Sequence, residues 1–518
     1  MLRTCVGARA LLWLVLGSLL SLGACTRLLP AEPALDGGAA DLNTPDPDHQ
    51  SLGDLAGEER ADLGADSAES PADINGGVAD LGPPAATVIT LGGSKNDVLR
   101  GLVATGGTIH VGGGFKTDLQ VDKQSFTSNA SHLAGFIVSY GSPMGIAPRV
   151  RLFDATIQCL VHSLALDDQQ RLYAGGIAHG TVTFGGAVGI HKTASRQQAF
   201  VLALDGAAQA RWLRAYKGTS NFQGHDLDWH LTAGLVAGGL YQSSAVANFG
   251  ALSLPASNPH DDPFALTLST SGLERWVYAP AGQGFSGVDA IAFRADGGVC
   301  MAGHMVGDAI FVKTATASPG QGGNDAFVVA LDASGTVLWW RHFGAKGDDR
   351  ALGVAAAGND CVAVGRISGA VDLGEGTAVP FVGGSDAYAV RYAANDGAVR
   401  WKRMIAGTGT DMARDVALLP NGDVAVVGSF TGDVSAGLQK RSSAGSSDGF
   451  LVILDGNSGG VKVLRREGGL GADVLNEVTV DGVTGELVVG GLYSGTIAVL
   501  GQTLKAVGLQ DIFVVRLP

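Results

Sequence analysis

The chain has 518 residues, of which 79 are glycine, 46% are hydrophobic and 16% are charged. Glycine at this frequency without a Gly-X-Y period excludes collagen, and the hydrophobic share excludes a chain that is disordered throughout. The net charge of −14 argues against nucleic acid as a partner.

Residues 1–24 have the layout of an export signal, with a short basic start and the apolar run Leu11 to Leu20, which is too short for a stable membrane span. Leu22-Gly23-Ala24-Cys25 follows. These four residues resemble a bacterial lipobox, and the resemblance implies cleavage before Cys25 and lipidation of its thiol. The alternative is an ordinary secretory signal with an accidental cysteine.

The resemblance to lipoproteins implies a membrane partner that is reached through the N-terminal lipid. Several acyl chains hold a protein to a bilayer where a single chain would not. Residue 26 is Thr rather than Asp, which by resemblance to enterobacterial sorting favours the outer membrane, on its periplasmic face or at the cell surface. Because no other stretch reaches the roughly 18 apolar residues of a span, we expect anchorage by lipid alone.

Residues 25–86 are expected to form an acidic, disordered tether. Thr26 to Ala86 contains 13 acidic and 2 basic residues and lacks Phe, Tyr and Trp, so it cannot bury enough surface to offset its chain entropy. A flexible coil of this length reaches about 45 Å. We interpret it as a solvated spacer rather than as a binding segment.

Residues 87–518 repeat one unit with a period of about 63 residues, and two markers each occur seven times. One marker is an aromatic residue that opens an apolar strand: Phe136, Phe200, Phe264, Phe327, Tyr388, Phe450 and Phe513. The other is a glycine that closes a Val/Ala-rich strand: Gly113, Gly176, Gly239, Gly303, Gly365, Gly428 and Gly491.

The fifth copy shows the unit best. It predicts strands at Ala351–Ala357, Cys361–Ile367, Asp386–Ala393 and Ala398–Ile405, separated by turns rich in Gly, Asn and Asp. The first strand is made of small residues, as needed where blades converge, and charges on the fourth strand would protect a free edge. Four strands in each of seven units predict an all-β, seven-bladed β-propeller.

The ends of the repeat array predict how the ring closes. The array stops after a third strand, and the missing fourth strand is present before the first copy. We therefore expect residues 87–91 to pair with residues 512–517, which would join the two ends of the array in one blade.

The fourth copy carries Gly323-Asn324-Asp325-Ala326-Phe327, then Val329-Ala330-Leu331-Asp332, Trp339 and Phe343-Gly344. These residues resemble bacterial β-propeller repeats of the SBBP type. The resemblance covers about residues 87–518 and is strongest in copies four to seven. It implies a propeller and export but no particular activity.

A tryptophan occurs in the fourth strand of four copies, as Trp212, Trp276, Trp339 and Trp401. Ala330-Leu331-Asp332, Ser334-Gly335 and Trp339 are similar to the tryptophan-docking motif of quinoprotein propellers, although the spacing is one residue short. In that family the tryptophans dock neighbouring blades, so the resemblance implies a structural role. We expect no bound cofactor.

The third copy concentrates polar residues at His225, Asp226, Asp228 and His230. On a strand, Asp226, Asp228 and His230 would share a face and are weak candidates for a Zn²⁺ site. A polar patch that lines the channel is the favoured interpretation. Aspartates that recur in the loops could bind Ca²⁺, but each loop offers only one or two, so we favour Asx turns.

Cys159, Cys300 and Cys361 remain after the signal and Cys25 are set aside. Cys300 and Cys361 lie three and four residues before the closing glycine of their copies, so they point to opposite faces of their strands. We therefore expect buried free thiols rather than a disulfide between them.

The leading hypothesis is a non-enzymatic, lipid-tethered binding propeller of the cell envelope, whose partner is an unidentified protein or polysaccharide. The alternative is an enzyme that uses the central channel, such as a lyase, a glycosidase or a quinoprotein-like enzyme. We read the first strands as mostly Ala, Val, Leu and Gly, with copy three as the exception, which favours binding. Three or more ionisable groups that converge in the channel would favour the enzyme. A structural module of an envelope assembly is a third possibility.

Overall fold

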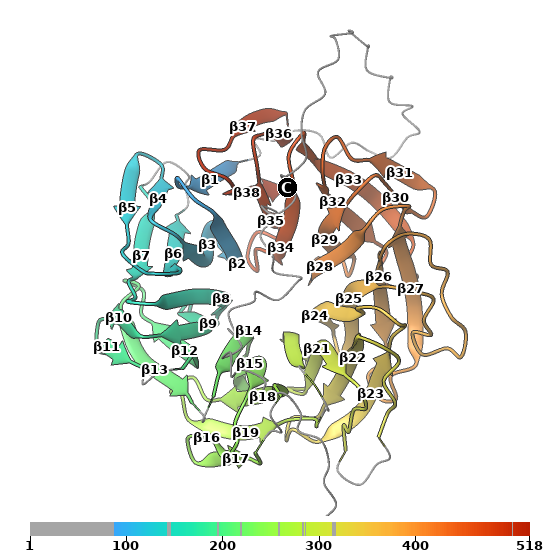
Figure 1. Ribbon diagram of the computed structural model, residues 1–518, viewed down its shortest axis with the longest axis horizontal. Coiled ribbons are helices and arrows are strands. Elements are labelled where there is room, and N and C mark those ends of the chain that lie inside the picture. The colour runs from blue at the N-terminus through green and yellow to red at the C-terminus, as the bar shows by residue number, and fades with distance from the viewer. Residues whose placement is uncertain are drawn as a thin grey trace, which may run out of the picture. The chain divides into compact units, whose positions relative to one another are not determined.

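The computed structural model describes residues 87–141, 147–193, 196–217, 220–256, 260–281, 284, 286–312, 317–499 and 501–517. Across these ranges the regular elements are β-strands, and no helix there is long and apolar enough to cross a membrane. The strands form seven antiparallel four-stranded blades that follow one another round a ring (Figure 1). The predicted seven-bladed β-propeller is therefore confirmed.

Blades 1 to 4 each take four strands in chain order. The strands are β2 (Asp97–Thr105), β3 (Thr108–Phe115), β6 (Ala134–Tyr140) and β7 (Arg149–Phe153); β8 (Gln158–Leu166), β9 (Leu172–His179), β12 (Gln198–Leu204) and β13 (Ala210–Tyr216); β14 (Phe222–His230), β15 (Gly234–Tyr241), β18 (Asp262–Leu268) and β19 (Glu274–Tyr278); and β20 (Gly287–Phe293), β21 (Val299–Val306), β22 (Asn324–Leu331) and β23 (Val337–Phe343).

Blades 5 and 6 have the same order, whereas blade 7 takes its outer strand from the other end of the array. The strands are β24 (Arg350–Ala357), β25 (Asp360–Ile367), β26 (Asp386–Tyr392) and β27 (Val399–Ala406); β28 (Asp411–Leu418), β29 (Val424–Phe430), β32 (Asp448–Leu454) and β33 (Val461–Gly469); and β34 (Val474–Val480), β35 (Leu487–Tyr493), β38 (Asp511–Leu517) and β1 (Val88–Gly92).

The two ends of the repeat array lie side by side in blade 7. β1 pairs antiparallel with β38, with Val88 opposite Val515 and Leu91 opposite Ile512. The backbone amide of Arg516 also donates to the carbonyl of Thr87. In this arrangement β1 supplies the outer strand that the C-terminal end lacks.

Short hairpins join neighbouring blades at the outer edge of the ring. They lie in the connection between the second and third strands, where the sequence analysis expected a loop. The paired strands are β4 (Asp118–Val121) and β5 (Gln124–Thr127), β10 (Thr181–Gly185) and β11 (Gly189–Lys192), β16 (Ala247–Phe249) and β17 (Leu252–Leu254), β30 (Asp433–Ala436) and β31 (Gln439–Ser442), and β36 (Thr496–Val499) and β37 (Gln502–Lys505).

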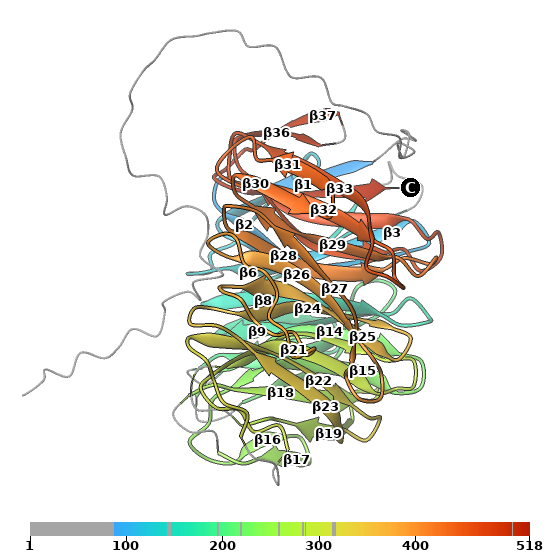
Figure 2. The same ribbon diagram turned by 90° about the vertical axis from the view of Figure 1, so that its right-hand side faces the viewer.

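Three of these hairpins extend the outer strand of the preceding blade. β4 pairs with β1, β30 with β27 and β36 with β33, and Figure 2 shows the last two hairpins beside β33. The outer strands of those blades are therefore partly covered. The hairpins pair only with the ends of these strands, as at Ile405 and Ala406 of β27, so the charged residues before those ends still lie on an outer edge.

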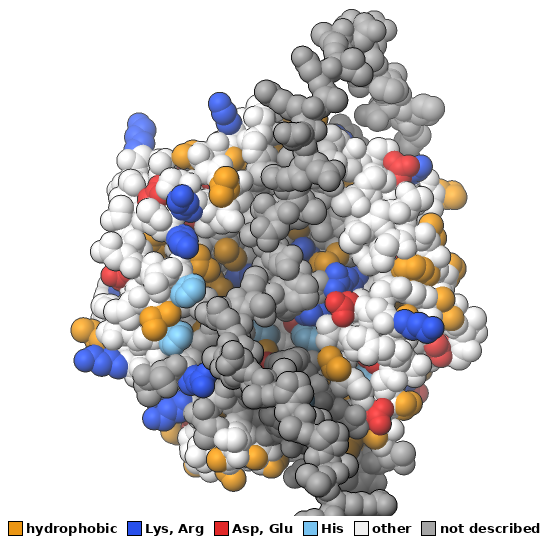
Figure 3. Space-filling view, viewed as in Figure 1, with side chains coloured by type: hydrophobic (Ala, Val, Ile, Leu, Met, Phe, Trp, Pro, Cys, Tyr) orange, Lys and Arg blue, Asp and Glu red, His pale blue; other side chains and the backbone are white. Residues whose placement is uncertain are grey.

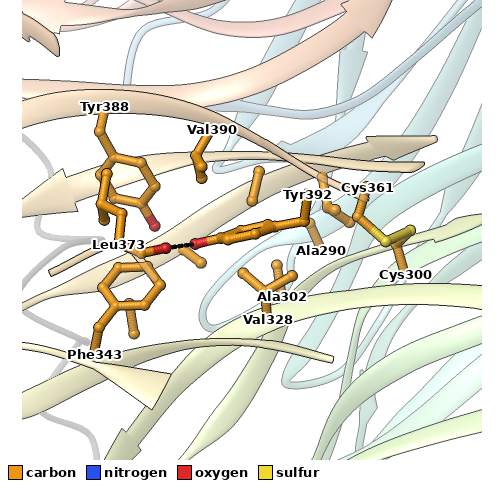
Figure 4. Close-up of a cluster of buried hydrophobic side chains, with 14 of the residues drawn as sticks. Ala290, Cys300, Ala302, Val328, Phe343, Cys361, Leu373, Tyr388, Val390 and Tyr392 are labelled. Carbon is orange, nitrogen blue, oxygen red and sulfur yellow. Dashed lines mark hydrogen bonds between the residues drawn. A yellow bond between two sulfur atoms is a disulfide. The ribbon is translucent and has the colours of Figure 1, made fainter. Parts of the chain in front are cut away.

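The hydrophobic core is divided among the seven junctions between blades. Each junction holds one cluster of buried side chains drawn from the facing sheets of two neighbours. At the junction of blades 4 and 5, for example, Ala302 and Val328 of blade 4 share a cluster with Tyr388 and Tyr392 of blade 5 (Figure 4). Stability therefore depends on packing between blades rather than on one central core.

The two repeat markers lie directly opposite each other in every blade. The closing glycine of the second strand pairs with the aromatic residue of the third, as Gly113 with Phe136 and Gly428 with Phe450. On its other side that glycine faces a carbonyl of the first strand, such as Val98 beside Gly113. A side chain would have no room there, which explains why the residue is glycine.

Candidate functional site

The first strands lie at one end of the blade sheets and contact one another round the axis of the ring (Figure 1). Every first strand has a β-bulge opposite the closing glycine. Bulges re-aim side chains and often lie next to functional sites. The residues that the bulges leave without a strand partner are Arg100, His162, His225, Asp289, Leu352, Arg414 and Asn476.

Six of these seven residues are polar, and three acidic residues follow them directly, as Asp226, Asp415 and Glu477. We call these nine residues the axial cluster. The first strands outside blade 3 are mostly small and apolar, as expected, but the bulge adds a polar position that a regular strand would pair and that the expectation did not include. Figure 3 shows acidic, basic and histidine side chains beside the centre of the ring.

Electrostatic interactions across the ring show that the cluster converges. Burial raises the pKa of Asp415 in blade 6 to about 7, and Asp226 in blade 3 adds to that effect. The pKa of Glu477 is raised well above its usual value. Burial is the largest cause, and the negative charges of Asp415 and Asp226 add to it. Arg100 and Arg414 oppose that shift of Glu477.

Two histidines from neighbouring blades stack within the cluster. The rings of His162 and His225 have centroids 5.5 Å apart and an interplanar angle of 15°. Nδ1 of His225 lies 2.8 Å from the carbonyl oxygen of Val288. Because a carbonyl oxygen only accepts, Nδ1 of His225 carries a proton.

Asp289 forms an ion-pair geometry with His304 of the same blade, with Oδ2 and Nδ1 2.7 Å apart. Burial favours the neutral form of Asp289, but His304, Arg350 and His225 lower its pKa below the ordinary value. Asp289 is therefore held as a carboxylate on the axial side of blade 4.

Two of the three candidate metal ligands of blade 3, Asp226 and Asp228, join it to neighbouring blades. Asp226 accepts hydrogen bonds from the Ser163 hydroxyl at 2.7 Å and from the Ile291 amide of blade 4 at 2.8 Å. Asp228 accepts from the Phe293 amide at 2.7 Å, and burial raises its pKa to about 6.

Nδ1 of His230 accepts from the amide of Ala233 at 3.2 Å, within its own turn. Asp415 repeats the arrangement of Asp226 and accepts from the amide of Val478 at 2.8 Å. No group of three His, Cys, Asp or Glu side chains placed to hold a metal ion occurs in the described ranges. The structure thus gives Asp226, Asp228 and His230 hydrogen-bonding roles in the fold.

Glu477 differs from the other acids of the cluster. Its carboxylate has no hydrogen-bond partner among the described residues, and its side chain is partly exposed. A regular repeat would place a short residue here, as Gly101 and Gly353 do in blades 1 and 5. Glu477 is therefore the acid of the cluster that is available to a ligand.

The four tryptophans lie between blades. Nε1 of each donates to a backbone carbonyl in the turn between the third and fourth strands of the next blade. The indole covers a glycine of that turn with positive φ, as Trp339 covers Gly397 at φ +65°. The pairs are Trp212 with Gly272, Trp276 with Gly335, Trp339 with Gly397 and Trp401 with Gly459.

Cys300 and Cys361 form a disulfide, which corrects the expectation of free thiols (Figure 4). Cys300 lies in β21 of blade 4 and Cys361 in β25 of blade 5, with Cα atoms 5.8 Å apart. The two residues do point to opposite faces of their own sheets. Because neighbouring blades stack face to face, those opposite faces meet at the junction. Cys159 is a buried free thiol.

Seven residues of the axial cluster were not predicted from the sequence: Arg100, His162, Asp289, Arg414, Asp415, Asn476 and Glu477. A glycine inside a strand often marks a bulge, and the closing glycine is the most regular feature of the repeat. The bulge residues lie 13 to 15 positions before that glycine in the seven copies, and six of the seven are polar. Cys25 and the signal peptide lie outside the described residues.

No model of a known protein family matches the chain, and no curated protein sequence matches it. Among solved structures, it is similar to quinohemoprotein alcohol dehydrogenase from Comamonas testosteroni, with 9% identity, a TM-score of 0.36 and coverage of 83% of this chain and 76% of that one. Sqt1 from Chaetomium thermophilum gives 12% identity, a TM-score of 0.39 and coverage of 78% and 96%.

A gluconolactonase from Xanthomonas campestris gives 11% identity, a TM-score of 0.31 and coverage of 84% and 99%. Similarity at this level carries no information about activity.

Proposed function

We propose that this chain is a binding propeller whose axial cluster takes a neutral, hydroxyl-rich ligand such as a saccharide. The observation that carries the proposal is the cross-ring convergence of acids, arginines and histidines at six of the seven bulged strands. Ligand sites with a few oriented polar groups at a concave centre are typical of binding proteins.

The charge of the cluster supports a neutral ligand. Arg100 and Arg414 carry charge opposite to that of the acids, and burial raises the pKa of Glu477, which favours its neutral form. A strongly anionic or cationic ligand would need a field of one sign, which this mixture does not provide. Donors and acceptors side by side suit hydroxyl groups.

Binding is favoured over catalysis because most of the acids already have partners. Asp226 and Asp415 hold backbone amides of the next blade, so neither is free to transfer protons without disturbing the ring. The number of ionisable groups at the axis meets the condition that would favour an enzyme, but their hydrogen bonds restrict what they can do.

One observation favours a channel enzyme as the second candidate. Glu477 combines a raised pKa with a carboxyl group that has no partner among the described residues, which are properties of a general acid. In that case Glu477 would protonate the leaving group of a glycoside or a similar substrate.

A glycan array followed by titration calorimetry tests both candidates. We expect Glu477→Ala and Arg414→Ala to weaken binding of the best oligosaccharide by about tenfold or more, since each removes a side chain that would hydrogen-bond the ligand. Glu375→Gln is the control, because Glu375 pairs with Lys402 away from the axis. Equal affinity of the axial variants and the wild type would contradict the proposal. Turnover that Glu477→Gln abolishes would favour the enzyme.

The cellular setting is also a proposal. The lipobox-like segment supports lipidation at Cys25, attachment to the outer membrane and a spacer of residues 25–86, and the repeat pattern supports the SBBP type. The partner would then be an envelope polysaccharide or a protein that displays one. Labelling with an alkyne fatty acid should modify the wild type but not Cys25→Ser, and the variant should leave the membrane fraction. A variant that stays labelled would contradict this.

A further inference from the structure

Two equivalent positions at each blade junction hold a pair of residues whose identity changes along the ring. One opens the third strand of a blade and the other opens the first strand of the next blade. From the junction of blades 1 and 2 onward the pairs are Ala134 and Cys159, Gln198 and Phe222, Asp262 and Ser286, Asp325 and Asp349, Asp386 and Asp411, Asp448 and Asp473, and Asp511 and Asp97. Four successive junctions thus hold two aspartates each.

The aspartates of these four pairs are buried, with at most 2% of their surface exposed. All but Asp411 accept a hydrogen bond from a backbone amide four residues earlier in their own loop, as Asp97 does from Gly93 (2.7 Å) and Asp448 from Ala444 (2.7 Å). Other carboxylate oxygens, including Oδ1 of Asp97, Asp325 and Asp448, are buried without a hydrogen-bond partner in the described ranges. A buried oxygen of this kind is costly unless it carries or receives a proton.

The members of a pair act on each other electrostatically. Asp511 raises the pKa of Asp97, Asp386 that of Asp411, Asp349 that of Asp325 and Asp448 that of Asp473, in each case in addition to burial, which is the largest cause. Two buried carboxylates that repel each other cannot both ionise at low energetic cost. We propose that each pair holds one proton between its two carboxyl groups, so that the junctions from blade 4 round to blade 1 tighten in acid and loosen in base.

The four junctions differ in the charged groups that lie near each aspartate pair, and these groups set how strongly the pair retains its proton. At blades 4 and 5, His342 lies 4.0 Å from Asp325 and Arg366 acts on Asp349. At blades 6 and 7, Arg466 lies 3.5 Å from Asp448. No basic group acts on the other two pairs within the described part of the chain, and Asp118 adds a third negative group beside Asp97 and Asp511.

The pKa values follow these differences, with burial as the main cause. They rise to about 8 for Asp97 and about 7 for Asp411, against about 6 for Asp325 and Asp473. The junction that contains β1 therefore keeps its proton to the highest pH and loses stability over the widest pH range.

The sign of the pH dependence follows from linkage. The folded chain keeps these protons up to a higher pH than the unfolded chain, whose aspartates lose theirs near pH 4. The free energy of unfolding therefore falls as pH rises from about 4 to about 8. Asparagine has the size of a protonated aspartate and cannot ionise. Replacing one aspartate of a pair by asparagine should therefore remove the contribution of that pair to the pH dependence of the free energy of unfolding.

Thermal unfolding of the full chain between pH 5 and pH 9 tests the inference. We expect Asp97→Asn and Asp411→Asn to unfold close to the wild-type temperature at pH 5 and roughly 2 °C or more above it at pH 9. Asp168→Asn, which changes an exposed aspartate, is the control and should follow the wild type at every pH.

Two results would overturn the inference. Variants that are less stable than the wild type by the same amount at every pH would give the pairs a merely structural role. A chelator-treated wild type that CaCl2 stabilises at pH 7.5, with no such effect in Asp97→Asn, would make the pair a cation site instead.

Discussion

Gly397 illustrates how single glycines set the contact between blades. It has φ +65°, and an added Cβ would lie 2.6 Å from the indole of Trp339 in the preceding blade. Gly358 has nearly the same backbone, at φ +67°, but nothing lies within 4 Å of the added atom. The two positions therefore separate backbone strain from a steric clash.

We predict that Gly397→Ala lowers the free energy of unfolding by about 2–4 kcal/mol, because backbone strain of about 1 kcal/mol adds to a clash of about 1–3 kcal/mol. Gly358→Ala should cost only the strain. Urea unfolding of the two variants measures the difference. Equal losses would show that the indole does not pack on the turn as described.

The residues of the axial cluster show where sequence reasoning stopped. Periodicity alone assigned the first strands to the centre of the ring and described them as small and apolar, which is right for Ala351 and Val354. It could not place Arg414 or Glu477, because a bulge shifts the alternation of faces by one residue. Asp226 and Asp228 were recognised as a polar pair, but their partners are amides of the next blade, which lie 65 residues away in the chain.

At the scale of strands and sheets, the repeat unit was predictable to within about one residue. In blade 5 the expected strands agree with β24 to β27 because Gly, Asn and Asp turns punctuate them clearly. The hairpins between second and third strands were missed, since β30 and β31 are short and polar on one face. The disulfide was missed because the alternation of residues along a strand shows which face of its own sheet a side chain is on. It does not show which face of the neighbouring sheet packs against it.

The disulfide between Cys300 and Cys361 should stabilise the junction of blades 4 and 5. It closes a loop with a sequence separation of 61 residues, and loops of that length are typically stabilised by about 2–4 kcal/mol. We predict that Cys300→Ser or a reductant lowers the unfolding temperature by several degrees, and that the variant no longer responds to reductant. Cys159→Ser, which changes the buried free thiol, keeps the disulfide and should still lose stability with reductant. Unfolding that is indifferent to reductant in the wild type would contradict the bond.

At the scale of the whole molecule, ring closure links the fold to the proposed function. The axial cluster draws on blades 1 to 4, 6 and 7, and the interaction of Glu477 with Arg100 crosses the junction that β1 completes. The acid-stabilised aspartate pair of Asp97 and Asp511 lies at the same junction. Loss of β1 should therefore weaken ligand binding and remove the largest part of the alkaline sensitivity.

Hydrogen exchange of the backbone amides of β1 in the full chain tests ring closure most directly. If β1 pairs with β38, its bonded amides should be protected about as well as those of β33, the fourth strand of blade 6, because both strands occupy the same place in their blades. Exchange of Val88–Gly92 at the rate of an unstructured segment, while β33 stays protected, would contradict a closed seven-bladed ring.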